Sequence, residues 1–250
     1  MKQMTDYTIA ENTMIARATY KMRLLGDSSW VAAPGQFINL KIAGCYLRRP
    51  ISISTWEAGE LTIVYKVAGK GTSILTQMEV GSQLNALVNL GNGFRLDVKE
   101  TKVVLIGGGV GVPPLLGLCR EWHKRGKDIH VLLGFQTKED VFYEDEFRQF
   151  ACKVDICTDD GSYGHAGRVT GLLAELGLTN QYYATCGPKA MLRAVAGCSH
   201  AKGQISLEER MGCGYGACLA CTCHTKSGYA RICKEGPVLD SEEILWNDCK

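Results

Sequence analysis

The sequence lacks the features that mark membrane-spanning and secreted proteins. No apolar run reaches the roughly 18 residues that a spanning helix requires, and residues 1–10 contain no apolar stretch of signal-peptide length. The charge is nearly balanced, with 28 basic and 26 acidic residues and a formal net charge of +2. We therefore expect a cytoplasmic protein that binds neither membranes nor nucleic acids.

Proline and histidine are also scarce, with six and five residues respectively. The histidines show no metal-ligand spacing, and no pair of side chains suggests general acid–base catalysis. Cysteine, in contrast, is abundant: the chain has twelve, and five of them fall between Cys213 and Cys233. Without a secretion signal, this clustering favours a metal or cluster site over a disulfide framework.

The pattern of apolar residues changes twice along the chain. Up to about residue 98, short β-rich runs alternate with glycine and turn residues, which predicts an antiparallel β-barrel. From residue 103, apolar strands alternate with helix-like stretches, which predicts an α/β domain with a parallel sheet. The last part is rich in glycine and cysteine, and we expect its acidic end, 240–246, to be helical. We predict a multidomain chain with a barrel domain (1–98), an α/β domain (99–203) and a small C-terminal module (204–250).

The strongest local pattern is Cys213-x4-Cys218-x2-Cys221, followed by Cys233. This is the plant-type ferredoxin spacing for the first three of the four thiolates that hold a [2Fe–2S] cluster. Small residues between the cysteines suit a tight loop that brings amide N–H groups close to sulfur. A structural zinc site is the alternative, although zinc cysteines usually form two short knuckles. Cys223 is a spare thiol in this frame.

Two segments of the predicted barrel suggest a phosphate-bearing cofactor. Residues 48–54 read Arg-Arg-Pro-Ile-Ser-Ile-Ser, and alone they could be a basic edge strand in which proline limits pairing. Downstream, residues 69–72 read Gly-Lys-Gly-Thr, a turn that can offer backbone N–H groups to a pyrophosphate. The combination is more specific than either segment alone.

A third glycine turn follows the strand predicted at 103–106. Residues 107–114 read Gly-Gly-Gly-Val-Gly-Val-Pro-Pro and open a helix. Pro114 stands where the dinucleotide motif has its third glycine, but the turn still allows close backbone approach and offers N–H groups at a helix start. Residues 158–164 and Cys186-Gly187-Pro188 also follow predicted strands. We expect a dinucleotide at this edge of the sheet.

This order of barrel, Arg-Pro-x-Ser strand, Gly-x-Gly-Thr turn and α/β domain resembles the ferredoxin-NADP reductase superfamily. The resemblance implies FAD in the barrel domain and NAD in the α/β domain. It assigns FAD binding to Arg49, Pro50, Ile51, Ser52, Val64, Tyr65, Lys66, Gly71 and Thr72. It assigns NAD binding to Gly107, Gly109, Gly111 and Pro113, with Cys186 near the nicotinamide. The chain departs from the pattern at Ile51, where many relatives have tyrosine, and at Lys66, where arginine is expected.

The number of electrons that each cofactor exchanges sets the order of transfer between them. A nicotinamide gives up two electrons as hydride, whereas a [2Fe–2S] cluster accepts one at a time, so a flavin must stand between them. The expected cofactors are FAD, a [2Fe–2S] cluster held by Cys213, Cys218, Cys221 and Cys233, and NAD. The alternative for Cys186 is a buried thiol at the end of a strand.

The three predicted units leave no room for a catalytic domain such as a TIM barrel of about 250 residues. Over nearly its whole length the chain resembles the electron-transfer subunits of dihydroorotate dehydrogenase B, including residues 90–94 and 208–214, although the gap between Cys221 and Cys233 is short. The resemblance implies a heterotetramer, two copies of each chain, with an FMN-containing catalytic subunit of pyrimidine biosynthesis. A stand-alone reductase for an oxygenase or ferredoxin, and a non-redox nucleotide-binding protein with a zinc ribbon, are the alternatives.

Overall fold

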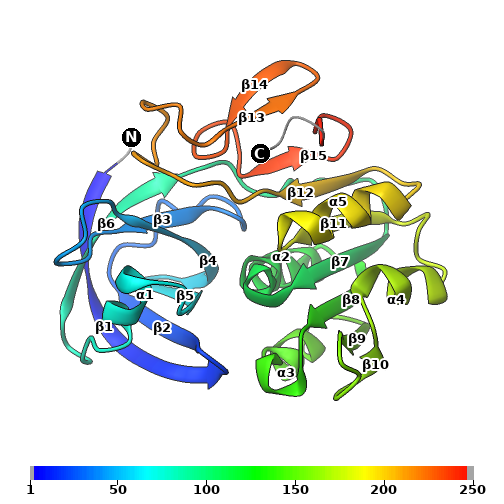
Figure 1. Ribbon diagram of the computed structural model, residues 1–250, viewed down its shortest axis with the longest axis horizontal. Coiled ribbons are helices and arrows are strands. Elements are labelled where there is room, and N and C mark those ends of the chain that lie inside the picture. Colours follow the sequence, from blue (N-terminus) through cyan, green and yellow to red (C-terminus); the bar gives the residue numbers. More distant parts are fainter. Residues whose placement is uncertain (1–2, 247–250) are drawn as a thin grey trace.

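Six antiparallel strands close into a barrel in the first part of the computed structural model, which describes residues 3–246 (Figure 1). The strand order is β1-β2-β5-β4-β3-β6, so the sheet has no free edge. In β6 every second residue is buried, which is the alternation expected of a strand with one apolar face. The predicted barrel is therefore confirmed. Its strands are β1 (Gln3–Ala16), β2 (Thr19–Leu25), β3 (Phe37–Leu40), β4 (Arg49–Glu57), β5 (Glu60–Lys66) and β6 (Gln83–Leu90).

A seven-stranded sheet follows in the order β10-β9-β8-β7-β11-β12-β15, and every neighbouring pair except β12–β15 is parallel. The central strand β7 is buried along nearly its whole length, as is typical of a parallel strand covered on both faces. The predicted α/β architecture is therefore confirmed. The strands are β7 (Lys102–Gly108), β8 (Asp128–Phe135), β9 (Lys153–Thr158), β10 (His165–Ala166), β11 (Tyr182–Cys186), β12 (Gly203–Ser206) and β15 (Val238–Asp240).

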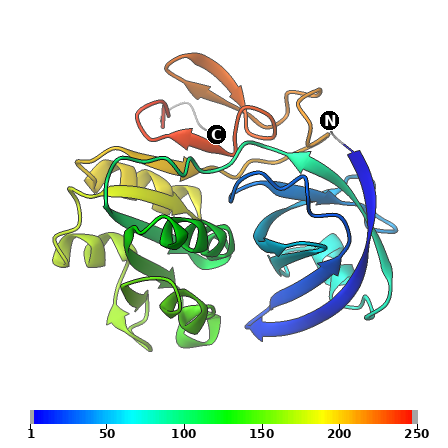
Figure 2. The ribbon, with the colours of Figure 1, turned by 180° about the vertical axis from the view of Figure 1, so that it is seen from behind.

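Helices cover both faces of this sheet (Figures 1 and 2). α2 and α3 pack with Val103 and Leu105 of β7, whereas α4 and α5 pack with Val104 and Ile106 of the same strand. No helix within residues 3–246 is long and apolar enough to cross a membrane. The helices are α1 (Lys70–Leu75), α2 (Val112–Lys124), α3 (Glu144–Arg148), α4 (Val169–Glu175) and α5 (Lys189–Cys198), with short 3₁₀ turns η1 (Gly109–Gly111) and η2 (Lys138–Asp140).

The C-terminal region shares its strands with the α/β domain. β12 and β15 extend the seven-stranded sheet, and the hairpin of β13 (Thr222–Thr225) and β14 (Gly228–Arg231) stands beside it. The domain limit that we place between residues 203 and 204 therefore falls inside β12. Figures 1 and 2 show the hairpin, in orange, above both the barrel and the sheet.

The acidic stretch 240–246 is not helical, so that prediction was wrong. Asp240 ends β15, residues 241–243 form a turn, and Ile244 makes a bridge to Thr225. The carbonyl of Glu243 accepts the backbone N–H of Lys226 at 2.9 Å. These pairings with distant segments engage backbone groups that a helix would need for its own hydrogen bonds.

The barrel and the α/β sheet meet where α2 packs against β4. Gly117 of α2 lies at this contact: a Cβ atom there would come within 2.7 Å of the Ser54 carbonyl oxygen and 3.2 Å of the Trp56 ring. Glycine inside a helix costs about 1 kcal/mol relative to alanine, so the close approach lowers the intrinsic stability of α2 at Gly117. The two domains are thus held backbone against backbone.

Candidate functional site

The cysteine-rich loop directs backbone amides at one sulfur. The Sγ atom of Cys213 accepts N–H groups from Tyr215, Ala217 and Cys218 at 3.5, 3.3 and 3.4 Å. The Sγ atom of Cys218 in turn accepts the N–H of Cys213 at 3.3 Å. Burial by itself would raise the pKa of the Cys213 thiol, but the amides outweigh it and lower this pKa to about 6. The loop therefore stabilises a thiolate, which is the form that binds metal.

The other two predicted ligands form a buried pair. Cys221 and Cys233 are 2% and 1% exposed, and the N–H of Cys233 donates to the Sγ atom of Cys221 at 3.4 Å. Burial, together with the neighbouring Cys221, raises the pKa of Cys233 to about 12. Neighbouring thiolates repel each other, so the full set requires the positive charge of a bound metal.

The four predicted ligands lie in two pairs. A [2Fe–2S] cluster distributes four thiolates over two irons. The pairing of Cys213 with Cys218, and of Cys221 with Cys233, fits that requirement. Cys223 lies one residue into β13 and is buried.

Asn39 of β3 connects the cysteine loop to the barrel. Its Nδ2 atom donates to the carbonyl of Cys213 at 3.4 Å, and Asn39 is the register partner of Pro50 in β4. Gly214, at φ +75°, permits this approach, because a Cβ atom there would collide with Nδ2 of Asn39. The cysteine loop therefore lies beside the 49–52 segment that we expect to bind FAD.

Arg49 and Gly71, two of the predicted FAD ligands, come together from different elements. The guanidinium of Arg49 lies over Gly71 of α1, where a Cβ atom would be 2.5 Å from Nε. The Oγ1 atom of Thr72 accepts the N–H of Ala68 at 2.9 Å, so its hydroxyl shapes the turn. A guanidinium beside a glycine turn is an arrangement that suits a phosphate.

The remaining residues of the 49–52 segment follow the alternation of β4. Ile51 packs against the barrel core. Because successive side chains of a strand point to opposite faces, Pro50 and Ser52 project from the outer face of the barrel. Ser52 is paired in register with Phe37, which belongs to the core shared with the C-terminal module. This outer face is where a ring system could lie between barrel, sheet and cysteine loop.

The three predicted FAD residues of β5 point in different directions. Val64 belongs to the core of the α/β domain, and β5 contacts η1. Tyr65 turns into the barrel, where its hydroxyl donates to Oδ1 of Asn12 at 2.8 Å, so Tyr65 can offer a cofactor only its backbone. Lys66 is ion-paired with Asp140 of the α/β domain, with Nζ and Oδ1 3.3 Å apart.

The glycine turn after β7 lies against the Cys-Gly-Pro segment after β11. A Cβ atom on Gly111 would be 2.5 Å from the carbonyl carbon and oxygen of Cys186, and Gly107 is the register partner of Cys186. Gly109, at φ +50°, faces open space. Pro113 and the proline after it have no N–H, so donors for a pyrophosphate must come from the turn itself. The turn fits a dinucleotide that approaches its backbone closely.

Cys186 is a neutral thiol. It is 1% exposed, and burial raises its pKa well above the ordinary range of thiols. Beside it, Thr185 donates its hydroxyl to the carbonyl of Ile106 at 2.8 Å. The turn after β9 is closed by the N–H of Tyr163, which donates to Oγ1 of Thr158 at 3.0 Å. All three segments predicted for NAD therefore follow the carboxyl ends of parallel strands.

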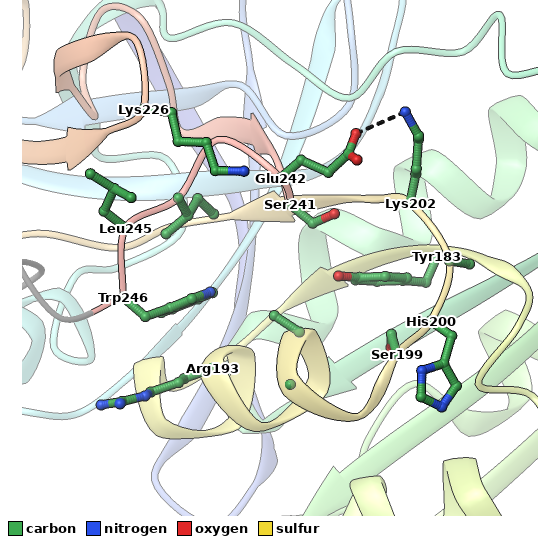
Figure 3. Close-up of a pocket in the computed structure, with 14 residues that line it drawn as sticks. Tyr183, Arg193, Ser199, His200, Lys202, Lys226, Ser241, Glu242, Leu245 and Trp246 are labelled. Atoms are coloured by element: carbon green, nitrogen blue, oxygen red, sulfur yellow. Dashed lines mark ion pairs between the residues drawn. The ribbon is translucent and has the colours of Figure 1, made fainter.

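A hollow of about 770 Å³ lies away from these segments, at the amino ends of β11 and β12 (Figure 3). Figure 3 shows Trp246 and Tyr183 facing it from different sides, and Lys202 at its rim is ion-paired with Glu242 at 3.0 Å. None of the predicted site residues lines this hollow. The predicted residues instead belong to β4, β5, α1, the segment from the end of β7 to the start of α2, the end of β11 and the cysteine-rich region.

Two residues that connect the barrel to the other parts of the chain could not be identified from a sequence pattern. Asn39 is one polar residue within a short apolar strand, and Asp140 is one of several acidic residues at 139–146. Their partners, Cys213 for Asn39 and Arg17 for Asp140, are more than a hundred residues away in the chain. Only the folded arrangement reveals them.

Comparison with family models gives two matches. Residues 208–245 match the iron-sulfur cluster binding domain of dihydroorotate dehydrogenase B. Residues 105–197 match an oxidoreductase NAD-binding domain. The first match covers the cysteine loop and both hairpin strands, and the second begins in β7 and ends in α5.

Curated relatives match nearly end to end. A protein of Geobacillus kaustophilus (strain HTA426), named "Dihydroorotate dehydrogenase B (NAD(+)), electron transfer subunit", is 42% identical over 250 residues, covering 95% of this chain and 97% of the relative. A protein of Fusobacterium nucleatum with the same name is 41% identical over 255 residues, covering 96% and 97%.

Solved structures share the fold. One described as an NADH-dependent reduced ferredoxin-NADP oxidoreductase, studied for flavin-based electron bifurcation, has a TM-score of 0.88 at 26% identity and covers 96% of this chain and 90% of its own. A ferredoxin NADP+ reductase from Neisseria gonorrhoeae has a TM-score of 0.66 at 17% identity, covering 78% and 89%. At this low identity, the second likeness shows a shared fold and nothing more.

Proposed function

Since the chain belongs to the family of dihydroorotate dehydrogenase B electron transfer subunits, we propose that it carries electrons between a catalytic partner chain and NAD through FAD and a [2Fe–2S] cluster. FAD, when bound, exchanges two electrons with a nicotinamide and single electrons with a cluster. The observation that carries the proposal is the cysteine loop: its amides stabilise a thiolate at Cys213, and Asn39 fixes that loop beside the 49–52 strand.

The chain's own residues would bind and orient these groups. Arg49, over Gly71, would hold the flavin phosphate, while Pro50 and Ser52 on the outer face of β4 would lie along the ring. The remaining proposed FAD contacts are Ile51, Val64, Tyr65, Lys66 and Thr72. The proposed cluster ligands are Cys213, Cys218, Cys221 and Cys233, and the three units remain 1–98, 99–203 and 204–250, with β12 shared.

The NAD side would use the carboxyl edge of the parallel sheet. Gly107, Gly109, Gly111 and Pro113 would approach the pyrophosphate, and the neutral Cys186 would form part of the nicotinamide pocket. The contact of β5 with η1 supports this assignment, because it brings the proposed flavin strand against the proposed dinucleotide turn. Hydride transfer requires such contact, since reacting atoms must come within about 3.5 Å.

The partner would be an FMN-containing dihydroorotate dehydrogenase catalytic subunit, in a heterotetramer with two copies of each chain. The cluster loop offers a docking surface: Cys218 is exposed, and next to it Tyr215 and Leu219 are 45% and 62% exposed. Exposed aromatic and aliphatic side chains around a redox centre suit a protein interface. In this complex electrons would flow from dihydroorotate toward NAD+ in pyrimidine biosynthesis.

We place this activity in the cytoplasm. No disulfide joins the cysteines within residues 3–246. Thiols remain reduced in the cytosol, whereas oxidising compartments convert them to disulfides.

Cofactor content and partner capture test the proposal. The chain purified anaerobically is expected to contain flavin, iron and labile sulfide, and to bleach at the flavin band when NADH is added. Produced together with the catalytic chain, it is expected to co-purify and to reduce NAD+ with dihydroorotate. A colourless, zinc-containing protein would contradict the redox function. A flavin- and iron-loaded chain that never binds the catalytic subunit would instead support a stand-alone reductase.

A further inference from the structure

One short segment of the α/β domain touches both proposed cofactor sites. It follows β8 and runs from residue 137 to residue 143, including η2. On one side, the N–H of Lys138 donates to Oγ of Ser162 at 2.8 Å, in the turn proposed for NAD. On the other side, Asp140 contacts Lys66 at the end of the proposed flavin strand. The segment therefore bridges the NAD edge and the barrel.

Asp140 is the centre of this bridge. Its carboxylate is only 6% exposed, yet it meets two cations of the barrel. Arg17, from the turn between β1 and β2, approaches with Nη2 at 2.5 Å from Oδ2 and Nε at 3.3 Å from Oδ1. Lys66 lies 3.3 Å from Oδ1. A single carboxylate of one domain thus holds both the β1–β2 turn and the end of β5 in the other.

Backbone and ring contacts reinforce the same junction. The N–H of Arg17 donates to the carbonyl of Glu139 at 2.9 Å. Three residues beyond Asp140, Tyr143 adopts φ +68° and brings its hydroxyl to 3.5 Å from Oγ of Ser54 in β4. A non-glycine residue in the left-handed region costs of order 1 kcal/mol or more, and such conformations persist where the surroundings impose them. The segment is therefore fixed against the barrel at two points.

The electrostatics make this contact specific. Burial by itself would raise the pKa of Asp140, but Arg17 and Lys66 outweigh it and lower that pKa, so the carboxylate stays ionised. If the buried carboxylate of such a network is removed, the cations that it pairs with lose compensation. Neutralising Asp140 would therefore take the α/β-domain carboxylate away from Lys66 and leave Arg17 with Glu139 alone, at 3.3 Å.

We propose that Asp140 is a positioning residue for hydride transfer, which holds Lys66 and its flavin strand in register with the dinucleotide edge. The inference rests on the proposed function and adds a residue that touches neither substrate nor cofactor. A misplacement of about 1 Å between reacting groups can cost about a hundredfold in rate. The effect is expected on the hydride step itself and not on the binding of either cofactor.

The test uses the flavin- and cluster-loaded chain with its catalytic partner, mixed anaerobically with NADH in a stopped-flow instrument. Asp140→Asn is expected to slow flavin reduction about tenfold, while the Kd for NAD+ stays within about twofold and FAD content is unchanged. Asp140→Glu, which keeps the charge, is expected to restore most of the rate. A rate-only loss with rescue by glutamate is not what general destabilisation produces.

Glu60→Gln is the matched control. Glu60 forms a comparable pair with Arg23, at 2.8 and 2.7 Å, but both residues belong to the barrel. This variant should reduce its flavin at the wild-type rate. An equal loss in Glu60→Gln and Asp140→Asn would overturn the proposal, as would a wild-type rate in Asp140→Asn.

Arg17→Met keeps the inference testable if Asp140→Asn fails to fold. This variant removes the guanidinium that pairs with Asp140 and keeps the ion pair between Asp140 and Lys66. Hydride transfer should therefore slow less than in Asp140→Asn. Where both variants fold, the double variant should be no slower than Asp140→Asn, since the two residues act as one unit. An Arg17→Met rate equal to wild type would contradict the proposal. Failure of the wild-type flavin to react with NADH would instead contradict the proposed function.

Discussion

Two cysteine environments in this chain have opposite acid–base character. At the glycine-rich loop, three backbone N–H groups converge on Cys213 and lower its pKa to about 6. At the end of β11, Cys186 is 1% exposed and burial raises its pKa. The same side chain is thus prepared as a thiolate in one place and kept as a neutral thiol in the other. The orientation of nearby amides, and not the residue type, decides which chemistry a cysteine serves.

The difference matches the two proposed roles. A metal ligand must lose its proton, and amides that donate to sulfur favour that loss. A thiol beside a nicotinamide pocket must contribute shape without adding a charge near the hydride path. Variants at the cysteine loop and at the nicotinamide edge test this contrast.

Removing a thiolate from the loop should have the largest effect. In the complex with the catalytic subunit, Cys218→Ala is expected to abolish electron transfer between orotate and NADH, because the cluster loses a ligand. Reduction of the flavin by NADH should stay within about twofold of wild type, since Cys186 and the glycine turn are untouched. Equal loss of both activities would mean that the cysteine module supports folding, as a structural metal does.

Crowding the loop against the barrel should have the next largest effect. Gly214→Ala places a Cβ atom against Asn39, whereas Gly126→Ala, at a similar φ of +69°, meets open space. Both variants carry a backbone strain of roughly 1–2 kcal/mol, so the difference between them isolates the contact with Asn39. Iron content should fall several-fold in Gly214→Ala only. Similar iron contents in the two variants would show that the contact with Asn39 is dispensable.

On the other side of the comparison, Gly111→Ala should disturb the surroundings of Cys186. Its Cβ atom would be 2.5 Å from the Cys186 carbonyl, so the dinucleotide turn must shift. We expect the KM for NADH to rise about tenfold, with iron content unchanged. Gly197→Ala in α5 meets open space and should leave the KM at the wild-type value. Steady-state reduction of a dye acceptor measures both.

The smallest effect is expected at Cys186 itself. Cys186→Ser replaces a neutral thiol by a neutral hydroxyl, so NADH-dependent flavin reduction should slow only about threefold. Because a raised pKa keeps the thiol protonated below that pKa, the wild-type rate should show no ionisation of Cys186 between about pH 6 and about pH 9. A rate that rises through this range in wild type, and is flat in Cys186→Ser, would place a thiolate there instead.

The features that depend on residues close in the sequence could be predicted from the sequence alone. The alternation of apolar and polar residues predicted the barrel and the parallel sheet, because the periods of strands and helices are visible among residues close in the sequence. The cysteine spacing predicted the cluster domain, which the family match at residues 208–245 supports. The glycine turns were found for the same reason: backbone approach to a ligand requires glycine locally.

Long-range contacts were beyond these patterns. The acidic stretch 240–246 looked helical, but its backbone pairs with Lys226 and Thr225 instead. Tyr65 was expected along the flavin, yet its ring lies in the barrel core, since strand alternation fixes which neighbours share a face. Asp140 and Asn39 emerge only when distant segments meet. The residues next to Asp140 and Asn39 in the sequence give no sign that either side chain makes a contact between domains.

The most direct test of the central claim is an anaerobic titration of the purified chain with NADH, followed by electron paramagnetic resonance. We expect NADH to bleach the flavin and to produce the spectrum of a reduced [2Fe–2S] cluster in the wild type, while Cys218→Ala shows flavin bleaching alone. A wild-type chain that contains iron and sulfide, reduces its flavin fully and never shows the cluster spectrum would contradict the claim.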